Sequence, residues 1–271
     1  MNPEDLQTAR DLVRSARHVV VFTGAGMSAE SGIPTFRDPG GVWDQFPPER
    51  FATVSGLTSV YRREPDELRR FLYVGMHSLL QAEPNAGHLA IAQLAGATPV
   101  TVVTQNIDGL HQRAGSTVVH ELHGSMFELY CTQCNRGQRA SVDQLRNMVD
   151  RLADPLPATA ARRRILRILH PIIPKCAHCR GRVRPTVVLF EEMLPPRAWN
   201  PAEQAASDCD LMIVVGTSAT VHPAALLPEL ARRVGARIIL VNKDPDMRPR
   251  GGDIAFTAGA AIALPELIKA D

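Results

Sequence analysis

Hydrophobic residues occur along this chain in short, unbroken runs rather than in strict alternation with polar ones. Strands that are covered on both faces have this composition, because neither face meets water. The runs are rich in Val and Ile and therefore predict buried parallel strands. They cover residues 18–23, 99–104, 117–122, 186–190, 210–216 and 237–242.

Helical periodicity fills many of the intervals between these runs. The pattern predicts helices at 66–81, at 86–95 with Asn85 as its cap, and at 223–234, where Gly235 follows the last turn. The alternation of strands and helices predicts an α/β fold with a Rossmann-like open parallel sheet.

Two stretches interrupt the alternation. Residues 33–65 are rich in proline and glycine and predict a long loop with short helices, which we interpret as a cofactor-binding segment. Residues 128–185 contain both cysteine pairs and interrupt the sheet, so they predict a small inserted module. The Rossmann-like domain would then comprise residues 1–127 and 186–271.

Composition and charge narrow the class of protein. Apolar residues make up 45% and charged residues 21%, as in ordinary globular proteins. No apolar run reaches the roughly 20 residues of a membrane span, and the N-terminus lacks an apolar signal core, so we expect a cytoplasmic protein. The net charge of +2 conceals a basic segment, since residues 135–185 carry eleven Arg and one Lys against three Asp.

The cysteines predict a metal site. Cys131 and Cys134 form one C-x-x-C pair and Cys176 and Cys179 form another, and four thiolates suit a closed structural zinc site. A redox role is the alternative, but two pairs occur and neither follows the first strand of a βαβ unit. The fifth cysteine, Cys209, precedes a predicted buried strand and is interpreted as a packed free thiol.

The first predicted strand runs into the sequence GAGMSA at residues 24–29, which fits G-x-G-x-x-G/A. Glycines at these positions allow a tight turn and a close approach to a pyrophosphate at the next helix N-terminus. A glycine turn without a ligand remains the alternative. A hydride-transfer enzyme is disfavoured, because no strand ending in an acidic residue follows about 20 residues later; Asp44 lies in the proline-rich loop.

Several further motifs accompany this turn in a fixed order. Together with the two C-x-x-C pairs, the chain resembles the sirtuin family of NAD-dependent protein deacylases, in its bacterial type with a long zinc-module insertion. The resemblance covers essentially the whole chain. The motifs that carry it are GAGMSAESGIPTFRDPGGVW (24–43), TQNIDGLHQRAG (104–115), ELHG (121–124), GTSATVHPAA (216–225) and VNKDP (241–245).

This resemblance implies NAD as a co-substrate and one structural Zn²⁺. Phe36 would cover the nicotinamide ribose, Arg37 would add charge at the phosphates, Asp108 would bind the nicotinamide carboxamide, and Asn242 would hold the adenosine ribose in place of the missing acid. The full set of implied cofactor-binding residues is Gly24, Ala25, Gly26, Ser28, Ala29, Phe36, Arg37, Trp43, Gln105, Asn106, Ile107, Asp108, Gly216, Thr217, Ser218, Asn242, Lys243, Asp244 and Ala260.

The implied catalytic residues are His123, Asn106 and Asp108. His123 would be the general base, since an ordinary histidine titrates near neutral pH. In the implied reaction the acyl oxygen displaces nicotinamide, and His123 deprotonates a ribose hydroxyl that attacks the acyl carbon. A purely structural histidine is the alternative. The remaining histidines that adjoin the motifs are interpreted as packing or polar residues; these are His88, His111, His120 and His222.

Two positions depart from the family pattern. Members that prefer acidic acyl groups carry Tyr and Arg where this chain has Leu72 and Gly75, so we expect a preference for neutral acyl groups. The family reads Phe-Gly-Glu where this chain reads Phe190-Glu191-Glu192. Glu resists the positive φ that Gly permits, so Glu191 would weaken or shift peptide binding, favour basic substrates, or be tolerated by the local backbone.

Acylated-lysine proteins are the expected substrates, and no membrane partner is expected. A mono-ADP-ribosyltransferase using the same NAD site is one alternative, and a non-catalytic NAD-responsive binding module is another. The basic surface around residues 162–170 is interpreted as solvated. Nucleic acid is not an expected partner, because the insert lacks the aromatic residues that stack on single-stranded bases.

Overall fold

The computed structural model describes residues 1–36, 40–244 and 249–269. The chain forms two compact units, and each is described by itself. The first unit comprises residues 1–33, 83–122 and 194–271, and the second comprises residues 34–82 and 123–193. Among the described residues, no helix combines the length and the apolar character needed to span a membrane.

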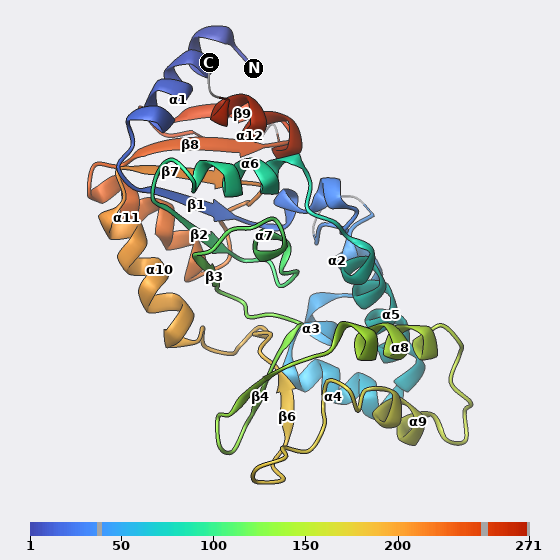
Figure 1. Ribbon diagram of the computed structural model, residues 1–271. Helices are drawn as coiled ribbons and strands as arrows, with labels where there is room; N and C mark the ends of the chain where they lie inside the picture. Colours follow the sequence, from blue (N-terminus) through green and yellow to red (C-terminus); the bar gives the residue numbers. More distant parts are fainter. Residues whose placement is uncertain (37–39, 245–248, 270–271) are drawn as a thin grey trace. The chain divides into compact units, whose positions relative to one another are not determined.

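The first unit is built on a six-stranded parallel sheet with the order β3-β2-β1-β7-β8-β9 (Figure 1). The chain places β2 and β3 on one side of β1 and the later strands on the other, so the order reverses between β1 and β7. Ligands bind at such a switch point in open α/β sheets. The strands are β1 (Val19–Thr23), β2 (Val100–Thr104), β3 (Val119–Glu121), β7 (Leu211–Val215), β8 (Arg237–Asn242) and β9 (Ile254–Thr257).

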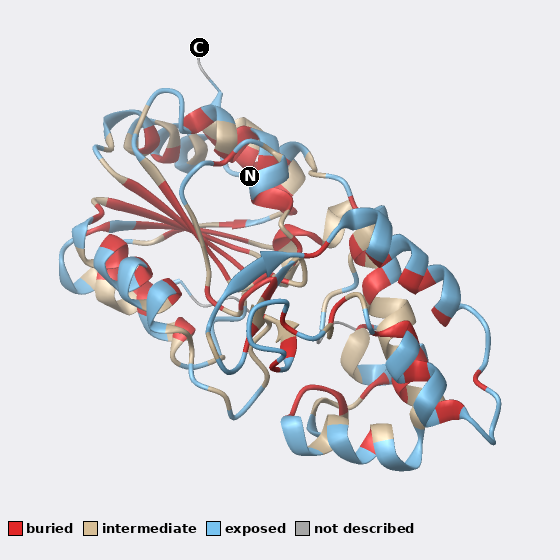
Figure 2. Ribbon diagram, turned by 60° about the horizontal axis from the view of Figure 1, so that its bottom comes forward, coloured by how far each residue is buried: buried red, intermediate tan, exposed pale blue. Residues whose placement is uncertain are grey.

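Helices cover both faces of this sheet, and the strands between them are buried (Figure 2). Successive strand residues point to opposite faces, so Val19 and Val21 pack in one core cluster, whereas Val20 and Phe22 pack in the other. The helical segments of this unit are α1 (Pro3–Ser15), η1 (Ala25–Met27), η2 (Ala29–Ser31), α6 (Ala86–Leu94), α7 (Leu110–Arg113), α10 (Pro196–Asp208), η3 (Ala224–Leu226), α11 (Leu227–Arg233) and α12 (Ala260–Ile268).

The second unit combines helices with a small antiparallel sheet of order β5-β4-β6. Its buried side chains come largely from helices that are distant in sequence, because α5 packs on both α8 and α9. The elements are α2 (Val42–Gln45), α3 (Pro48–Phe51), α4 (Val54–Arg63), α5 (Pro65–Gln81), β4 (Glu128–Cys131), β5 (Gly137–Arg139), α8 (Val142–Leu152), α9 (Ala161–Ile168) and β6 (Val183–Pro185). The predicted module 128–185 lies within this unit, which also includes residues 34–82.

One predicted strand is wrong. Residues 186–190 do not join the parallel sheet and form no strand. They lie instead beside residues 123–128 of the second unit, where the Thr186 N–H donates to the Glu128 carbonyl and the Val188 N–H donates to the His123 carbonyl. An apolar run of this length does not distinguish a sheet strand from such an extended segment.

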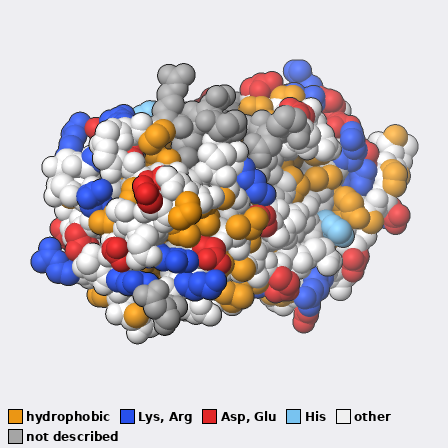
Figure 3. Space-filling model, turned by 90° about the horizontal axis from the view of Figure 1, so that it is seen from above, with side chains coloured by type: hydrophobic (Ala, Val, Ile, Leu, Met, Phe, Trp, Pro, Cys, Tyr) orange, Lys and Arg blue, Asp and Glu red, His pale blue; other side chains and the backbone are white. Residues whose placement is uncertain are grey.

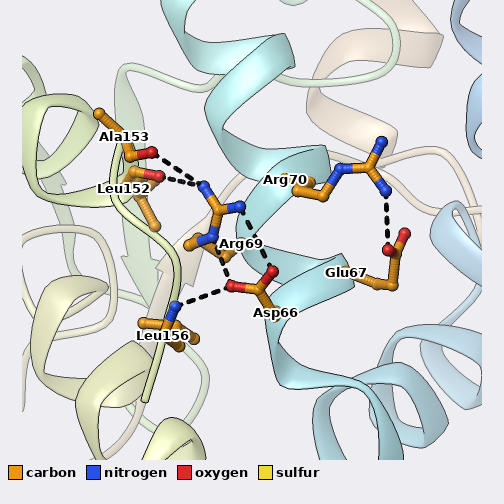
Figure 4. Close-up of polar contacts among 7 residues, drawn as sticks. All are labelled: Asp66, Glu67, Arg69, Arg70, Leu152, Ala153 and Leu156. Carbon is orange, nitrogen blue, oxygen red and sulfur yellow. Dashed lines mark hydrogen bonds and ion pairs between the residues drawn. The ribbon is translucent and has the colours of Figure 1, made fainter. Parts of the chain in front are cut away.

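A buried arginine fixes α5 to the connection between α8 and α9 (Figure 4). Arg69 is 7% exposed and donates to the Asp66 carboxylate at 2.6 Å and to the Leu152 carbonyl at 2.6 Å. Asp66 in turn accepts from the Leu156 N–H at 2.9 Å. The hydrogen bond from Arg69 holds the pKa of Asp66 below its ordinary value. This cluster fixes the chain that leads into α9.

Replacing Arg69 by Met is therefore expected to lower the free energy of unfolding by about 2–3 kcal/mol, because it leaves buried carbonyls without a donor. Arg70→Met is the matched control, since Arg70 lies on the same helix and its 2.7 Å ion pair with Glu67 is solvent-exposed. That variant should change the stability by less than about 0.5 kcal/mol. Urea denaturation measures both, and equal effects would contradict this role of Arg69.

Candidate functional site

The glycines at the switch point bring two strand ends into direct contact. A Cβ on Gly24 would lie 2.7 Å from the Thr217 Cβ, and one on Gly26 would lie 2.7 Å from the Gly216 Cα. Gly216 itself has a φ of 57°, which favours glycine. The Gly24 N–H donates to the Val215 carbonyl at 3.0 Å. The chain segments that follow β1 and β7 therefore pack backbone against backbone, which leaves no room for side chains at these glycines.

The segment after this turn differs from the predicted α-helix. Residues 25–31 form two short 3₁₀ turns, η1 and η2, and end at Gly32 with a φ of 86°. The 3₁₀ form winds the chain tightly over a few residues and leaves backbone N–H groups at its start. The predicted helix N-terminus at the pyrophosphate position is thus replaced by these turns.

A buried chain of hydrogen bonds adjoins the glycine turn. The Asn106 side-chain amide donates to the Gly24 carbonyl at 3.0 Å and to Ser28 Oγ at 3.1 Å. Ser28 Oγ donates to the Asp108 carboxylate at 2.7 Å, and the Leu110 N–H donates to its other oxygen at 2.9 Å. Burial raises the pKa of Asp108 against these hydrogen bonds. Motifs that are about 80 residues apart in sequence thus form one polar cluster.

A second group of predicted residues meets at Thr217, beyond the end of β7. The Gln105 side-chain amide donates to Thr217 Oγ1 at 2.8 Å, and the Asn242 amide donates to the Thr217 carbonyl at 3.2 Å. Ser218 is exposed, and its hydroxyl lies 3.0 Å from Thr220 Oγ1. The ends of β2, β7 and β8 therefore converge on Thr217, which the family resemblance had implied only as a cofactor-binding residue.

Glu30 is a residue that the sequence reasoning missed. Its carboxylate accepts from the Ala261 N–H at 2.7 Å, in the first turn of α12, and lies 3.4 Å from Lys243 Nζ. An acid at a helix N-terminus is stabilised by the helix dipole. Glu30 therefore links the segment after β8 to the start of α12. Three predicted cofactor-binding residues, Lys243, Asp244 and Ala260, belong to these two segments. The only feature of the sequence that could have indicated this role was the position of Glu30 within the 24–43 motif.

Two histidines lie buried behind this cluster. His88 and His111 have ring centroids 4.8 Å apart, and His111 Nε2 lies 3.1 Å from Thr23 Oγ1. Burial lowers the pKa of His88 to about 4 and that of His111 to about 3, so both are neutral at physiological pH. Thr23 Oγ1 donates to Thr104 Oγ1 at 2.8 Å, which also accepts from the Asn106 N–H. The histidines support the position of Asn106.

The remaining predicted active-site residues belong to the second unit. His123 is half-buried, and its carbonyl accepts from the Val188 N–H at 2.9 Å. Gly124 has a φ of 73°, and a Cβ there would lie 2.0 Å from the Thr186 carbonyl oxygen. A glycine is thus required directly after His123 for the segment 123–128 to lie this close to the segment 186–190. Arg37, the predicted phosphate contact, lies outside the described residues.

Aromatic rings form a short row in this unit. The Phe36 and Trp43 rings lie 4.9 Å apart, and those of Trp43 and Phe190 lie 6.4 Å apart. Phe36 is 42% and Phe190 41% exposed. Glu191 follows with a φ of 75°, so the backbone keeps the left-handed conformation that the family Gly would favour. An L side chain there costs roughly 1–2 kcal/mol.

The four cysteines of the C-x-x-C pairs converge in the second unit. Their sulfur atoms all lie within 4.8 Å of one another, with Cys131 and Cys179 at 3.5 Å and Cys134 and Cys176 at 3.7 Å. A tetrahedral zinc with bonds of about 2.3 Å places its sulfur ligands about 3.8 Å apart. Backbone N–H groups of Cys134 and Gln133 lower the pKa of Cys131 to about 6, which favours the ligating thiolate. The donor set fits one structural zinc ion.

Comparisons with known proteins find a family and relatives that match most of this chain. The model of the Sir2 family matches residues 24–223. The chain is 41% identical to an NAD-dependent protein deacylase of Pseudomonas putida, over 98% of this chain and 94% of that protein. It is 40% identical to NAD-dependent protein deacylase 2 of Pyrobaculum aerophilum, over 96% of this chain and 93% of that protein.

Solved structures show the same similarity. One is a Sir2 homologue in complex with 2′-O-acetyl-ADP-ribose, with a TM-score of 0.75 and 33% identity over 99% of this chain and 95% of that chain. Another is a Sir2 protein bound to a myristoylated histone peptide, with a TM-score of 0.68 and 34% identity over 98% of this chain and 95% of that chain.

Proposed function

Since the chain belongs to the Sir2 family and is an NAD-dependent protein deacylase, we propose that it releases the acyl group of a modified lysine as 2′-O-acyl-ADP-ribose. The observation that carries the proposal is the buried cluster of Asn106, Ser28 and Asp108 against Gly24, which places polar groups where a sheet of this type binds its ligand. The complex of a Sir2 homologue with 2′-O-acetyl-ADP-ribose supports the product.

In this proposal the first unit binds NAD and positions its nicotinamide ribose. The glycine backbone at Gly24 and Gly216, where the contact between the two strand ends excludes side chains, approaches the phosphates. Thr217 and Asn242 lie at the adjacent strand end and hold the adenosine half. The Asp108 carboxylate accepts from the nicotinamide carboxamide, and Asn106 orients the ribose.

The chemical step uses the acyl oxygen as the nucleophile. This oxygen bonds to the ribose C1′ as the bond from C1′ to the nicotinamide nitrogen breaks, so nicotinamide leaves neutral. His123 then accepts the proton of a ribose hydroxyl, and that oxygen bonds to the acyl carbon. The acyl carbon–nitrogen bond then breaks, and the lysine amine leaves with the proton that His123 holds. Water adds to the acyl carbon as its bond to the C1′ oxygen breaks, which leaves a hydroxyl on C1′ and the acyl group on the 2′ oxygen. The aromatic row of Phe36, Trp43 and Phe190 would keep water from C1′ until the acyl group arrives.

We also propose a preference for neutral acyl groups. An acidic acyl group needs a cation or hydroxyl donor to compensate its buried charge. Leu72 and Gly75 of α5 offer neither, and a Cβ added at Gly75 would meet nothing within 4 Å. The myristoylated histone peptide bound by a Sir2 relative shows that a long apolar acyl group is accepted within the family.

A peptide panel tests this preference. One lysine peptide is prepared with acetyl, butyryl, myristoyl, succinyl and glutaryl groups, and NAD-dependent release of the free lysine is measured by mass spectrometry. We expect kcat/KM for the acidic groups to be at least about 100-fold lower, which corresponds to roughly 2.7 kcal/mol for an unpaired charge. Faster desuccinylation than deacetylation would refute the preference for neutral acyl groups, but it would still be consistent with a deacylase. A peptide that carries ADP-ribose, in place of free acyl-ADP-ribose, would indicate ADP-ribosyl transfer.

A further inference from the structure

Helix α9 carries four exposed arginines on one short segment. Its sequence is ARRRILRI, and its buried face consists of Ala161, Ile165 and Ile168. Arg162, Arg163, Arg164 and Arg167 share the remaining circumference with Leu166 and are all exposed. Within the described residues none of them forms an ion pair, although other arginines of this unit do, such as Arg184 with Glu192 at 2.6 Å.

The surroundings of α9 share this excess of positive charge. Residues 123–193 carry twelve Lys and Arg against six Asp and Glu. Several of these cations are likewise exposed and have no ion pair to another described residue; they are Arg136, Arg139, Arg151, Lys175, Arg180 and Arg182. By contrast, basic and acidic side chains are interspersed on the face of the molecule in Figure 3. Clustered like charges destabilise a fold by mutual repulsion, so an uncompensated cluster suits an external anion.

The support of α9 makes this surface a fixed one. Arg69 and Asp66 of α5 hold the end of α8 and the following loop through Leu152 and Leu156 (Figure 4). The apolar face of α9 packs on α5 and α8. The four guanidinium groups therefore extend from a backbone that is already ordered, and binding through them costs little backbone entropy.

The composition of this surface distinguishes between two kinds of anionic partner, an acidic protein and a nucleic acid. The central part of a protein–protein interface is depleted of charged residues and enriched in aromatic ones. On α9 the only exposed apolar side chain is Leu166, at 45%. Interfaces with nucleic acid are far more positively charged. The absence of aromatic residues excludes stacking on single-stranded bases but leaves phosphate contacts open.

We propose that α9 and the cations around it bind the phosphate backbone of double-stranded nucleic acid, without sequence preference. Eight residues span about 12 Å along the helix axis, over which a duplex presents about seven phosphates. Arg163, Arg164 and Arg167 lie within about 100° of one another around the helix and can each meet a phosphate oxygen, which the guanidinium fork matches in geometry. Arg162 flanks this group. This binding is independent of the deacylase reaction.

The test compares two fourfold variants of the full-length protein with equal changes in net charge. The first is Arg162→Gln, Arg163→Gln, Arg164→Gln and Arg167→Gln. The control, Arg62→Gln, Arg63→Gln, Arg197→Gln and Arg233→Gln, removes exposed arginines elsewhere. Fluorescence anisotropy with a labelled 24-base-pair DNA duplex, between 50 and 200 mM salt, gives the affinity and its salt slope for each protein. Deacetylation of a peptide confirms that both variants are active.

The α9 variant is expected to bind at least about 100-fold more weakly at 50 mM salt. The slope of log K against log salt should fall in magnitude by about 3–4, because each phosphate that an arginine neutralises adds about 0.9 to it. The control should keep both values. Equal weakening in the two variants, or no binding by the unmodified protein, would overturn the proposal. Displacement of the duplex by poly-glutamate at equal charge would assign the surface to an acidic protein instead.

If the fourfold variant fails to fold, the double variant Arg163→Gln and Arg167→Gln replaces it. About half of the change in the salt slope is then expected.

Discussion

Alanine in place of His123 is expected to lower kcat for deacetylation by about 10²–10⁴-fold, the usual contribution of a positioned general base. The fold should persist, because the backbone of residue 123 is held by the hydrogen bond from Val188 and by the close contact of Gly124 with Thr186. In the proposed sequence the base acts after the bond to nicotinamide breaks. Exchange of labelled nicotinamide into NAD, in the presence of an acetylated peptide, should therefore continue in the variant.

His120→Ala is the matched control for this variant. His120 is a half-buried histidine three residues away, on β3, and burial lowers its pKa. It should lose less than about tenfold in kcat, through small changes in packing. Equal losses in the two variants would show that His123 acts only through the local structure. Loss of nicotinamide exchange together with deacetylation in His123→Ala would contradict its assignment to the second step.

The prediction of the fold succeeded where burial on both faces dictated the composition. The central residues of β1, β7 and β8 are apolar because helices cover both sides of these strands. β9 was not predicted, because Ile254–Thr257 is short, and its burial alternates with exposure instead of being continuous. The run at 186–190 was misassigned, since its half-buried residues pack on the 123–128 segment.

The prediction of the site depended on motifs whose residues meet only through tertiary structure. The sequence could name Ser28, Asn106 and Asp108, but not the hydrogen bonds that join them across β1 and β2. It could not find Glu30, whose partners Ala261 and Lys243 are more than 200 residues away. A contact between side chains this far apart in the chain leaves no periodic pattern in the sequence. The individual roles of these residues and the cytoplasmic location stay predictions.

Removal of zinc is expected to have the largest effect on stability. Structural zinc sites contribute on the order of 10 kcal/mol to folding in small domains, and the four sulfur atoms join two loops that are 41 residues apart in sequence. Cys176→Ser should therefore lose bound zinc and greatly increase amide hydrogen exchange in residues 123–193. The parallel sheet of the first unit has its own apolar core and should stay protected.

Cys209→Ser is the control, because Cys209 is a buried thiol of the first unit whose pKa burial raises to about 11. It should keep one zinc ion per chain, measured by elemental analysis, and the protection of residues 123–193. Four thiolate ligands leave no position on the zinc for a reactant, so the ion would take no part in the chemical step. The deacylase activity of Cys176→Ser should therefore fall only in proportion to the fraction of protein that is unfolded. Zinc loss with unchanged hydrogen exchange would contradict the structural role, and thiol–disulfide cycling coupled to activity would favour the redox alternative.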